Sequence, residues 1–279
     1  MTNYVHPETL VDTQWLADNL NNPNVRILEI DLKAESYQQE HIPNSIFFHG
    51  MLPFTPEFRF NFEPQAMSKL LGSFGITNET TIVTVHNSYM ASSGAIFWLL
   101  KVFGHEDVRI LNGGFPKWKQ DGYPLTSEET VVTTSQYEAK SPDESLRITL
   151  PDLQRSLSKC CTLLDVRTPQ EYRGEIFMSQ PPTKDERGGH IPSAVHLYYE
   201  LLHNEDGTFK SFDQLQEIFQ QYNILPHNSI IPYCAVGARA GHVWYILKYL
   251  LGYPHVQNYD GSWNEWSRIP ELSISVDDV

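Results

Sequence analysis

One cysteine stands where a strand-like run gives way to a helix-like run. Cys234 follows the apolar run 230–233 and opens the stretch CAVGARA, after which apolar residues recur with helical spacing. At such a turn, backbone N–H groups and the positive end of the helix dipole stabilise an anion, a thiolate included. The predicted active-site loop is Ala235, Val236, Gly237 and Ala238. The pattern predicts a nucleophilic cysteine, and a buried structural thiol is the alternative.

The elements that must position this cysteine occur twice in the chain. The stretch EHIPNSIFF at 40–48 parallels GHIPSAVHL at 189–197, and residues 80–118 parallel residues 228–266 at nearly the same offset. Such self-similarity indicates two copies of one module. A chance likeness between common α/β patterns is the alternative.

Short apolar runs alternate with helical patterns in both copies. The runs lie at 25–30, 45–48, 81–85 and 108–111, and again at 162–166, 194–197, 229–233 and 256–259. This alternation predicts parallel sheets that helices cover on both faces.

The two copies also predict the domain boundaries. We expect one domain at 1–128, a polar linker at 129–146 and a second, catalytic domain at 147–279. If the loop contains no gap, Asn87 falls opposite Cys234. Because asparagine is no nucleophile in this chemistry, the first domain is predicted to be non-catalytic.

The composition narrows the classes of function. The formal net charge of -14 would repel phosphate backbones, so we expect no nucleic-acid partner. The chain has no run of about 18 apolar residues, and no basic or apolar leader at its N-terminus. We therefore expect no membrane partner and a cytoplasmic location. Three cysteines, among them the adjacent Cys160 and Cys161, suit a reducing compartment and match no metal-site spacing.

Four motifs of the second copy together carry a family resemblance. They are LLDVRTPQEYRGE (163–175), GHIPSA (189–194), CAVGARA (234–240) and LKYLLGYPHVQNYDGSW (247–263). In this order and spacing the chain resembles the tandem-domain sulfurtransferases of the rhodanese superfamily, most closely the bacterial thiosulfate sulfurtransferases. The resemblance implies an α/β fold of two tandem rhodanese-like domains, each a parallel five-stranded sheet with helices on both faces.

The resemblance also implies a chemistry. The Cys234 thiolate would attack the outer sulfur of thiosulfate, release sulfite, and pass the sulfur from a persulfide to a thiophilic acceptor. The implied partners are a small-molecule sulfur donor and a thiol or cyanide acceptor. Neither a metal nor an organic cofactor is implied.

Three arginines are candidates for binding an anionic donor. Arg173 and Arg187 flank a stretch that the first copy lacks, and an insertion confined to one copy is a reasonable place for substrate recognition. In the family that the chain resembles, arginines at these two positions bind the anionic end of the substrate. Arg239 is the only charged residue of the loop. Ordinary surface ion pairing is the alternative for the flanking pair.

The residues after the cysteine leave the identity of the donor open. Thiosulfate-using relatives carry basic residues there, and 3-mercaptopyruvate sulfurtransferases carry a serine where this chain has Val236. This chain matches neither pattern, because Ala235 and Val236 are both apolar. Arg239 favours thiosulfate, and 3-mercaptopyruvate is the alternative donor.

Two other classes of protein remain as alternatives. Cysteine phosphatases and arsenate reductases hold a tetrahedral anion in a Cys-x5-Arg loop, whereas Cys234 and Arg239 form the shorter Cys-x4-Arg. The shorter loop suits a single sulfur atom better than a phosphate group. An inactive regulatory or binding module is the other alternative, against which the cysteine and the arginines argue.

Overall fold

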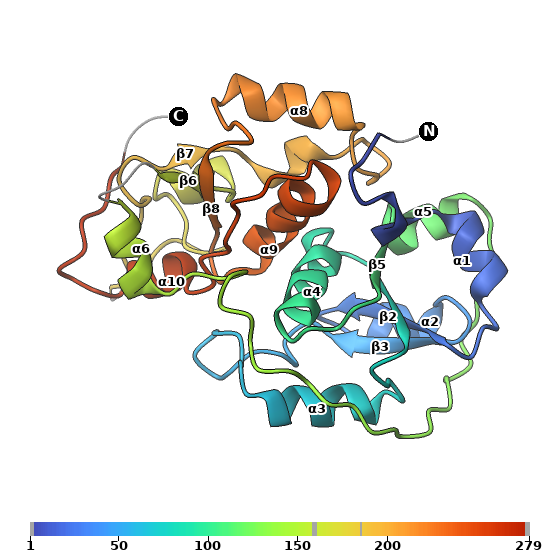
Figure 1. Cartoon of the computed structure of the whole chain (residues 1–279). Helices are drawn as coiled ribbons and strands as arrows, with labels where there is room; N and C mark the ends of the chain where they lie inside the picture. The colour runs from blue at the N-terminus through green and yellow to red at the C-terminus, as the bar shows by residue number, and fades with distance from the viewer. Residues whose placement is uncertain (1–2, 158–160, 185, 277–279) are drawn as a thin grey trace.

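The computed structural model describes residues 3–157, 161–184 and 186–276, which form two α/β lobes joined by an extended segment (Figure 1). The predicted α/β fold with two tandem domains is confirmed. Cys160 lies outside the described residues. Within those residues, no helix has the length and apolar character needed to cross a membrane.

The first lobe contains a parallel five-stranded sheet in the order β1-β5-β4-β2-β3. Its strands are β1 (Leu10–Val11), β2 (Val25–Asp31), β3 (Ser45–His49), β4 (Thr81–His86) and β5 (Val108–Leu111). Its helices are η1 (Pro7–Thr9), α1 (Thr13–Asn19), α2 (Glu35–Gln39), α3 (Pro64–Ser73), α4 (Ala91–Val102) and α5 (Gly114–Gln120). Nearly every residue of β2 and β4 is buried, which explains their apolar runs without alternation.

The second lobe has three regular parallel strands in the order β7-β6-β8. The strands are β6 (Cys161–Asp165), β7 (Val195–His196) and β8 (Ser229–Tyr233). The helices are α6 (Leu150–Leu157), α7 (Pro169–Tyr172), η2 (Tyr199–Leu202), α8 (Phe212–Gln221), α9 (Ala238–Tyr245), the π-helical η3 (Ile246–Leu250) and α10 (Ser262–Trp266). The sequence predicts five strands here. In place of the two further strands, the structure has two isolated parallel bridges, Arg147–Asn258 and Ile230–Val256.

Pro232 explains why the second sheet is shorter on this side. In the first lobe, β4 continues its pairing with β5 through Thr84 and Ile110. The matching position of β8 is Pro232, whose carbonyl accepts from the Tyr259 N–H but which has no N–H of its own to donate. The segment 255–259 therefore follows β8 without forming a regular strand.

The predicted linker 129–146 contains no regular strand and runs along α3 of the first lobe (Figure 1). Its Ser135 N–H donates to the Gly72 carbonyl, and Tyr137 and Ala139 are buried in the core. The segment is thus packed against the first lobe along much of its length.

The two lobes pack together through α4 and α9 (Figure 1). Two glycines allow this approach. A Cβ atom on Gly94 would lie 2.7 Å from the His242 Cα, and one on Gly241 would lie 3.4 Å from the Ala95 Cα. One buried apolar cluster includes residues of both lobes, so the loop after β8 is held against the first lobe.

Candidate active site

The loop after β8 wraps around the sulfur of Cys234. The Gly237 N–H donates to the Cys234 Sγ over 3.2 Å, and Cys234 is 1% exposed. Gly237 has a φ of 88°, and a Cβ atom there would lie 2.8 Å from the Asp260 carbonyl oxygen. A glycine is therefore required at this turn, where α9 begins at Ala238. A backbone donor aimed at the sulfur at the start of a helix stabilises a thiolate.

The turn before α10 fixes the backbone of the cysteine. The Cys234 N–H donates to the Ser262 Oγ over 3.0 Å, and the Ser262 hydroxyl donates to the Tyr259 carbonyl over 2.8 Å. The Cys234 carbonyl accepts from the Trp263 N–H over 2.9 Å. The sequence shows only a glycine turn at this place, so the role of Ser262 emerges from the structure alone.

Arg239 forms a buried ion pair with Glu171. Its Nη1 and Nη2 donate to the two carboxylate oxygens of Glu171 over 2.6 and 2.7 Å, and Arg239 is 9% exposed. Burial favours the neutral form of Glu171, but Arg239 and Arg167 hold the pKa of this carboxyl below its usual value. The pair ties α9 to α7 beside the loop. Arg239 was expected to bind substrate. In this structure both of its terminal nitrogens donate to Glu171.

Arg187 also has its partners within the chain. Its three guanidinium nitrogens donate to four carbonyl oxygens at distances between 2.6 and 3.2 Å. These oxygens belong to Trp266, Ser267, Ile269 and Leu272. The side chain thereby ties the insertion to the segment after α10, and its expected role in binding substrate stays a prediction.

Arg173 lies at the solvent-facing end of α7. Its Nε donates to the Glu175 Oε1 over 2.6 Å, and 30% of its side chain is exposed. The structure thus separates the three predicted arginines. Arg187 and Arg239 support the fold, whereas Arg173 combines a short ion pair with access to solvent.

His86 and Asn87 share the place of Cys234 in the first lobe. The Ile82–Val108 pair of the first sheet matches the Ile230–Val256 bridge of the second, so counting along the strands sets His86 opposite Cys234. Counting back from the starts of α4 and α9 sets Asn87 there, because five residues (86–90) separate this register position from α4, whereas four (234–237) precede α9. The assumption of a loop without a gap is thereby corrected, and neither position carries a thiol.

Comparisons with known proteins bear on the whole chain. A model of the "Rhodanese-like domain" matches residues 12–121 and again residues 149–269. The chain belongs to the rhodanese family. Both rhodanese domains are thus present, as the internal repeat predicts, and the two matches leave the extended segment between them.

Rhodanese relatives span nearly all of the chain. The "Sulfur carrier protein TtuD" of Thermus thermophilus is 39% identical over 98% of each chain. A protein of Haloferax volcanii named "Putative thiosulfate sulfurtransferase" is 35% identical over 94% of each chain. A solved structure of an anaerobic ergothioneine biosynthesis enzyme from Chlorobium limicola superimposes with a TM-score of 0.89 at 24% identity, over 99% of this chain and 72% of that one. This last likeness shows the fold alone.

Three buried histidines meet where the rhodanese domains pack together. The Nε2 atoms of His203 and His242 are 3.0 Å apart, so only one of them carries the proton of this hydrogen bond. Burial lowers the pKa of His86 to about 4 and that of His203 to about 3, and it lowers the pKa of His242 as well. Neither these histidines nor any other His, Cys, Asp or Glu side chains in the described part of the chain form a group of three that could hold a metal ion. These rings therefore stay neutral and pack the domain interface.

We expect acid to weaken this interface well above the pH at which carboxylates titrate. The unfolded histidines bind protons below about pH 6.5, and the folded ones do not until near pH 4, so the free energy of unfolding falls as the pH drops through this window. Each histidine contributes up to about 1.4 kcal/mol per pH unit. Urea titrations between pH 7 and pH 5 would measure the slope. His86→Gln should reduce it and the exposed His227→Gln should not; equal slopes in all three proteins would contradict the assignment.

A cavity of about 160 Å³ lies between the first rhodanese domain and the cysteine loop, and we call it the loop cavity. It is lined by Ile30, Asp31, Leu32, Gly50, Met51, Phe54, Phe60, Tyr89, Ser92, Ala95, Ile96, Val236 and Ala238. Val236 and Ala238 flank Gly237, which donates to the sulfur. Burial raises the pKa of the Tyr89 hydroxyl, against the opposing effect of the positive charge of Arg239. The first domain thus forms most of the wall of the loop cavity, and the cysteine loop forms the rest through Val236 and Ala238.

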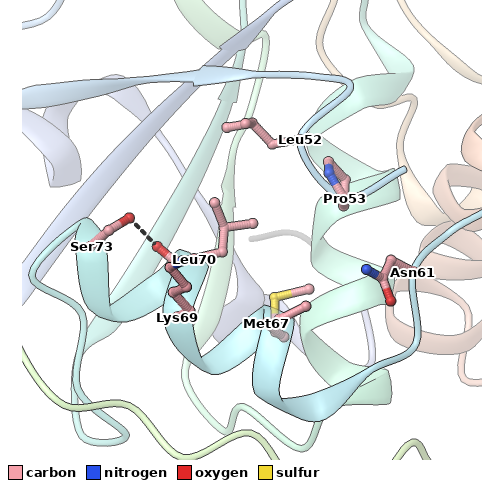
Figure 2. A pocket seen from close by; sticks show the side chains of 8 residues that line it. Leu52, Pro53, Asn61, Met67, Lys69, Leu70 and Ser73 are labelled. Atoms are coloured by element: carbon pink, nitrogen blue, oxygen red, sulfur yellow. Dashed lines mark hydrogen bonds between the residues drawn. The ribbon is translucent and has the colours of Figure 1, made fainter. Parts of the chain in front are cut away.

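A larger cavity of about 330 Å³ lies elsewhere in the first domain, between α3 and the chain around Pro53 (Figure 2). Its lining residues, which include Met67, Lys69 and Leu70, all belong to the first domain. None of the predicted site residues lines it. Size alone therefore does not mark the functional site in this molecule.

Proposed function

We propose that this chain is a thiosulfate sulfurtransferase that carries the transferred sulfur as a persulfide on Cys234. The observation that supports this most directly is the cradle of Cys234, a sulfur held by the Gly237 N–H at a strand-to-helix turn of a rhodanese domain. A relative named for thiosulfate transfer, 35% identical over 94% of the chain, agrees with this choice of donor. The first domain, with His86 and Asn87 at the matching place, serves as a non-catalytic wall of the site.

The proposed reaction has two half-reactions that share one sulfur carrier. In the first, the Cys234 thiolate attacks the outer sulfur of thiosulfate, an S–S bond forms, and the S–S bond of the donor breaks to release sulfite. In the second, a thiolate or cyanide attacks the outer sulfur of the persulfide, and Cys234 leaves as the thiolate. The Gly237 N–H stabilises the thiolate at the start and at the end of this cycle.

Arg173 is the arginine that we propose for binding the sulfonate end of the donor. Its side chain is 30% exposed, and its ion pair with the exposed carboxylate of Glu175 is of a kind that contributes little, so an incoming anion can compete for the guanidinium. Arg187 and Arg239 would have to give up buried or multiple contacts for the same task. We therefore propose structural roles for these two.

The other candidate functions find less support at the site. A phosphatase loop needs its arginine to face the bound anion, whereas Arg239 faces Glu171. The serine used by 3-mercaptopyruvate sulfurtransferases has no counterpart, because Val236 lines the loop cavity at that position. A reducing compartment such as the cytoplasm would keep Cys234 available as a thiol.

A parallel assay with the two donors tests the proposed function. With cyanide as acceptor, we expect thiosulfate to give the larger kcat/KM and to form thiocyanate in a ping-pong pattern. Arg173→Ala should raise the KM for thiosulfate about tenfold, because a charge-assisted contact to the anion is lost. Glu175→Ala serves as the matched control and should not raise it. A larger kcat/KM with 3-mercaptopyruvate would overturn the choice of donor.

A further inference from the structure

The loop cavity contains one charged side chain, Asp31, at the end of β2. The remaining lining is apolar except for the hydroxyls of Tyr89 and Ser92. Asp31 is only 7% exposed. Its Oδ1 accepts hydrogen bonds from the Leu32 N–H over 2.6 Å and from the Ser88 hydroxyl over 2.7 Å.

Asp31 forms no ion pair with any of the residues that the structure describes. A carboxylate this deeply placed usually has a cationic partner, because burial of an uncompensated charge is costly. Its Oδ2 has no hydrogen-bond partner within residues 3–157, 161–184 and 186–276. The carboxylate is therefore available to a group that enters the loop cavity.

In the second rhodanese domain, the strand position that corresponds to Asp31 carries a cation, Arg167. By strand register, Glu29 and Asp31 of the first domain match Asp165 and Arg167 of the second. In the second domain the Arg167 Nη2 donates to the Asp165 Oδ2 over 2.6 Å. In the first domain both residues are acids, and burial raises the pKa of Glu29 to about 7. The first domain thus has an acid, Asp31, at the register position where the second has the arginine of an ion pair.

Aromatic rings complete the wall beside Asp31. Phe54, Phe60 and Tyr89 all line the loop cavity, and the Phe54 and Phe60 ring centroids are 4.2 Å apart. Aromatic faces attract cations, most strongly alkylammonium groups in desolvated sites. The net charge of -14 would further concentrate cations at the protein surface. At about 160 Å³, the loop cavity has room for a small group only.

We propose that the loop cavity selects the sulfur acceptor, and that this acceptor is a small thiol bearing an ammonium group held by Asp31 and the aromatic wall. The inference rests on the proposed persulfide of Cys234. With the ammonium group in the cavity, the acceptor thiolate attacks the outer sulfur of the persulfide. The new S–S bond forms on the acceptor, the bond to Cys234 breaks, and the cysteine leaves as the thiolate that the Gly237 N–H receives.

A matched pair of acceptors tests this inference. Thiocholine carries a trimethylammonium group, and 3,3-dimethylbutane-1-thiol has the same shape without the charge. The protein is loaded with thiosulfate, freed of excess donor, and mixed with each thiol, and loss of the bound sulfur is followed by mass spectrometry. Because the two thiols differ in intrinsic reactivity, the quantity of interest is the ratio of their rate constants in wild type and in each variant.

We expect Asp31→Asn to lower this ratio about tenfold. The asparagine side chain keeps an oxygen that accepts hydrogen bonds, but it lacks the negative charge that attracts the ammonium group. Phe54→Leu should lower it as well, and this variant decides the outcome if Asp31→Asn does not fold. Asp18→Asn, which removes an exposed charge on α1, is the control and should leave the ratio unchanged. An unchanged ratio in a folded Asp31→Asn or in Phe54→Leu would overturn the inference.

The two proposals fail in distinguishable ways. If thiosulfate does not load Cys234, the proposed donor is wrong, and loading with inorganic polysulfide lets the acceptor comparison proceed. If loading succeeds and the ratio is unchanged in a folded Asp31→Asn or in Phe54→Leu, the loop cavity does not select a cation and the proposed function stands.

Discussion

Glu171→Ala should lower the free energy of unfolding by about 3–5 kcal/mol, because it leaves the buried Arg239 guanidinium without its counter-ion. Both hydrogen bonds from Arg239 to this carboxylate would be lost, at 2.6 and 2.7 Å in the folded protein. Glu171 also closes the capping box of α7, in which Thr168 accepts from the Glu171 N–H. Urea titration of the wild type and the variant would measure the loss.

Two control variants separate the buried charge from other effects. Glu175→Ala removes the exposed partner of Arg173 and should leave stability nearly unchanged. Glu171→Gln keeps one acceptor oxygen and should fall between the wild type and Glu171→Ala. Because the pKa of Glu171 is lowered in the folded protein, the contribution of the pair is present above the usual carboxyl pKa and is lost as pH falls further. A fully stable Glu171→Ala would show that the pair contributes nothing to the fold.

Cys234→Ser should lower sulfur transfer by about a thousandfold or more. A serine oxygen is a weaker nucleophile and forms no persulfide, and no other thiol stands in this loop. The hydroxyl fits the same space, so the variant should fold. Thiocyanate formation from thiosulfate and cyanide would measure the loss.

Cys161→Ser is the matched control for this substitution. Cys161 lies in β6 and donates to the Ser156 carbonyl, away from the loop after β8. Its replacement should leave turnover near that of the wild type. Substantial transfer by Cys234→Ser, or equal losses in both variants, would assign the sulfur to another residue.

The sequence is informative about this protein where the signal is local or repeated. Apolar runs of buried parallel strands and the internal repeat predict two α/β domains, and the turn after residues 230–233 predicts the position of Cys234. The small residues of the loop follow from the same reasoning, since Gly237 adopts a positive φ beside the Asp260 backbone. These features depend on neighbours in the chain, which the sequence displays directly.

The partners of the arginines depend on tertiary contacts and could not be predicted. Glu171 binds Arg239, which lies 68 positions further along the chain, and no local pattern indicates this pair. Arg187 likewise meets carbonyls of the segment after α10. The two loops differ in length by one residue, so strand register places His86 opposite Cys234 and the helix starts place Asn87 there. This difference requires the positions of both the strands and the helices.

The most direct test of the central claim is the mass of the intact protein after incubation with thiosulfate. We expect the wild type to gain one sulfur atom, to lose it again on addition of cyanide or a thiol, and to carry it on the peptide that contains Cys234. The Cys234→Ser variant should gain none. An equal gain in that variant, or a wild type that stays unmodified, would contradict the proposal that Cys234 carries the transferred sulfur.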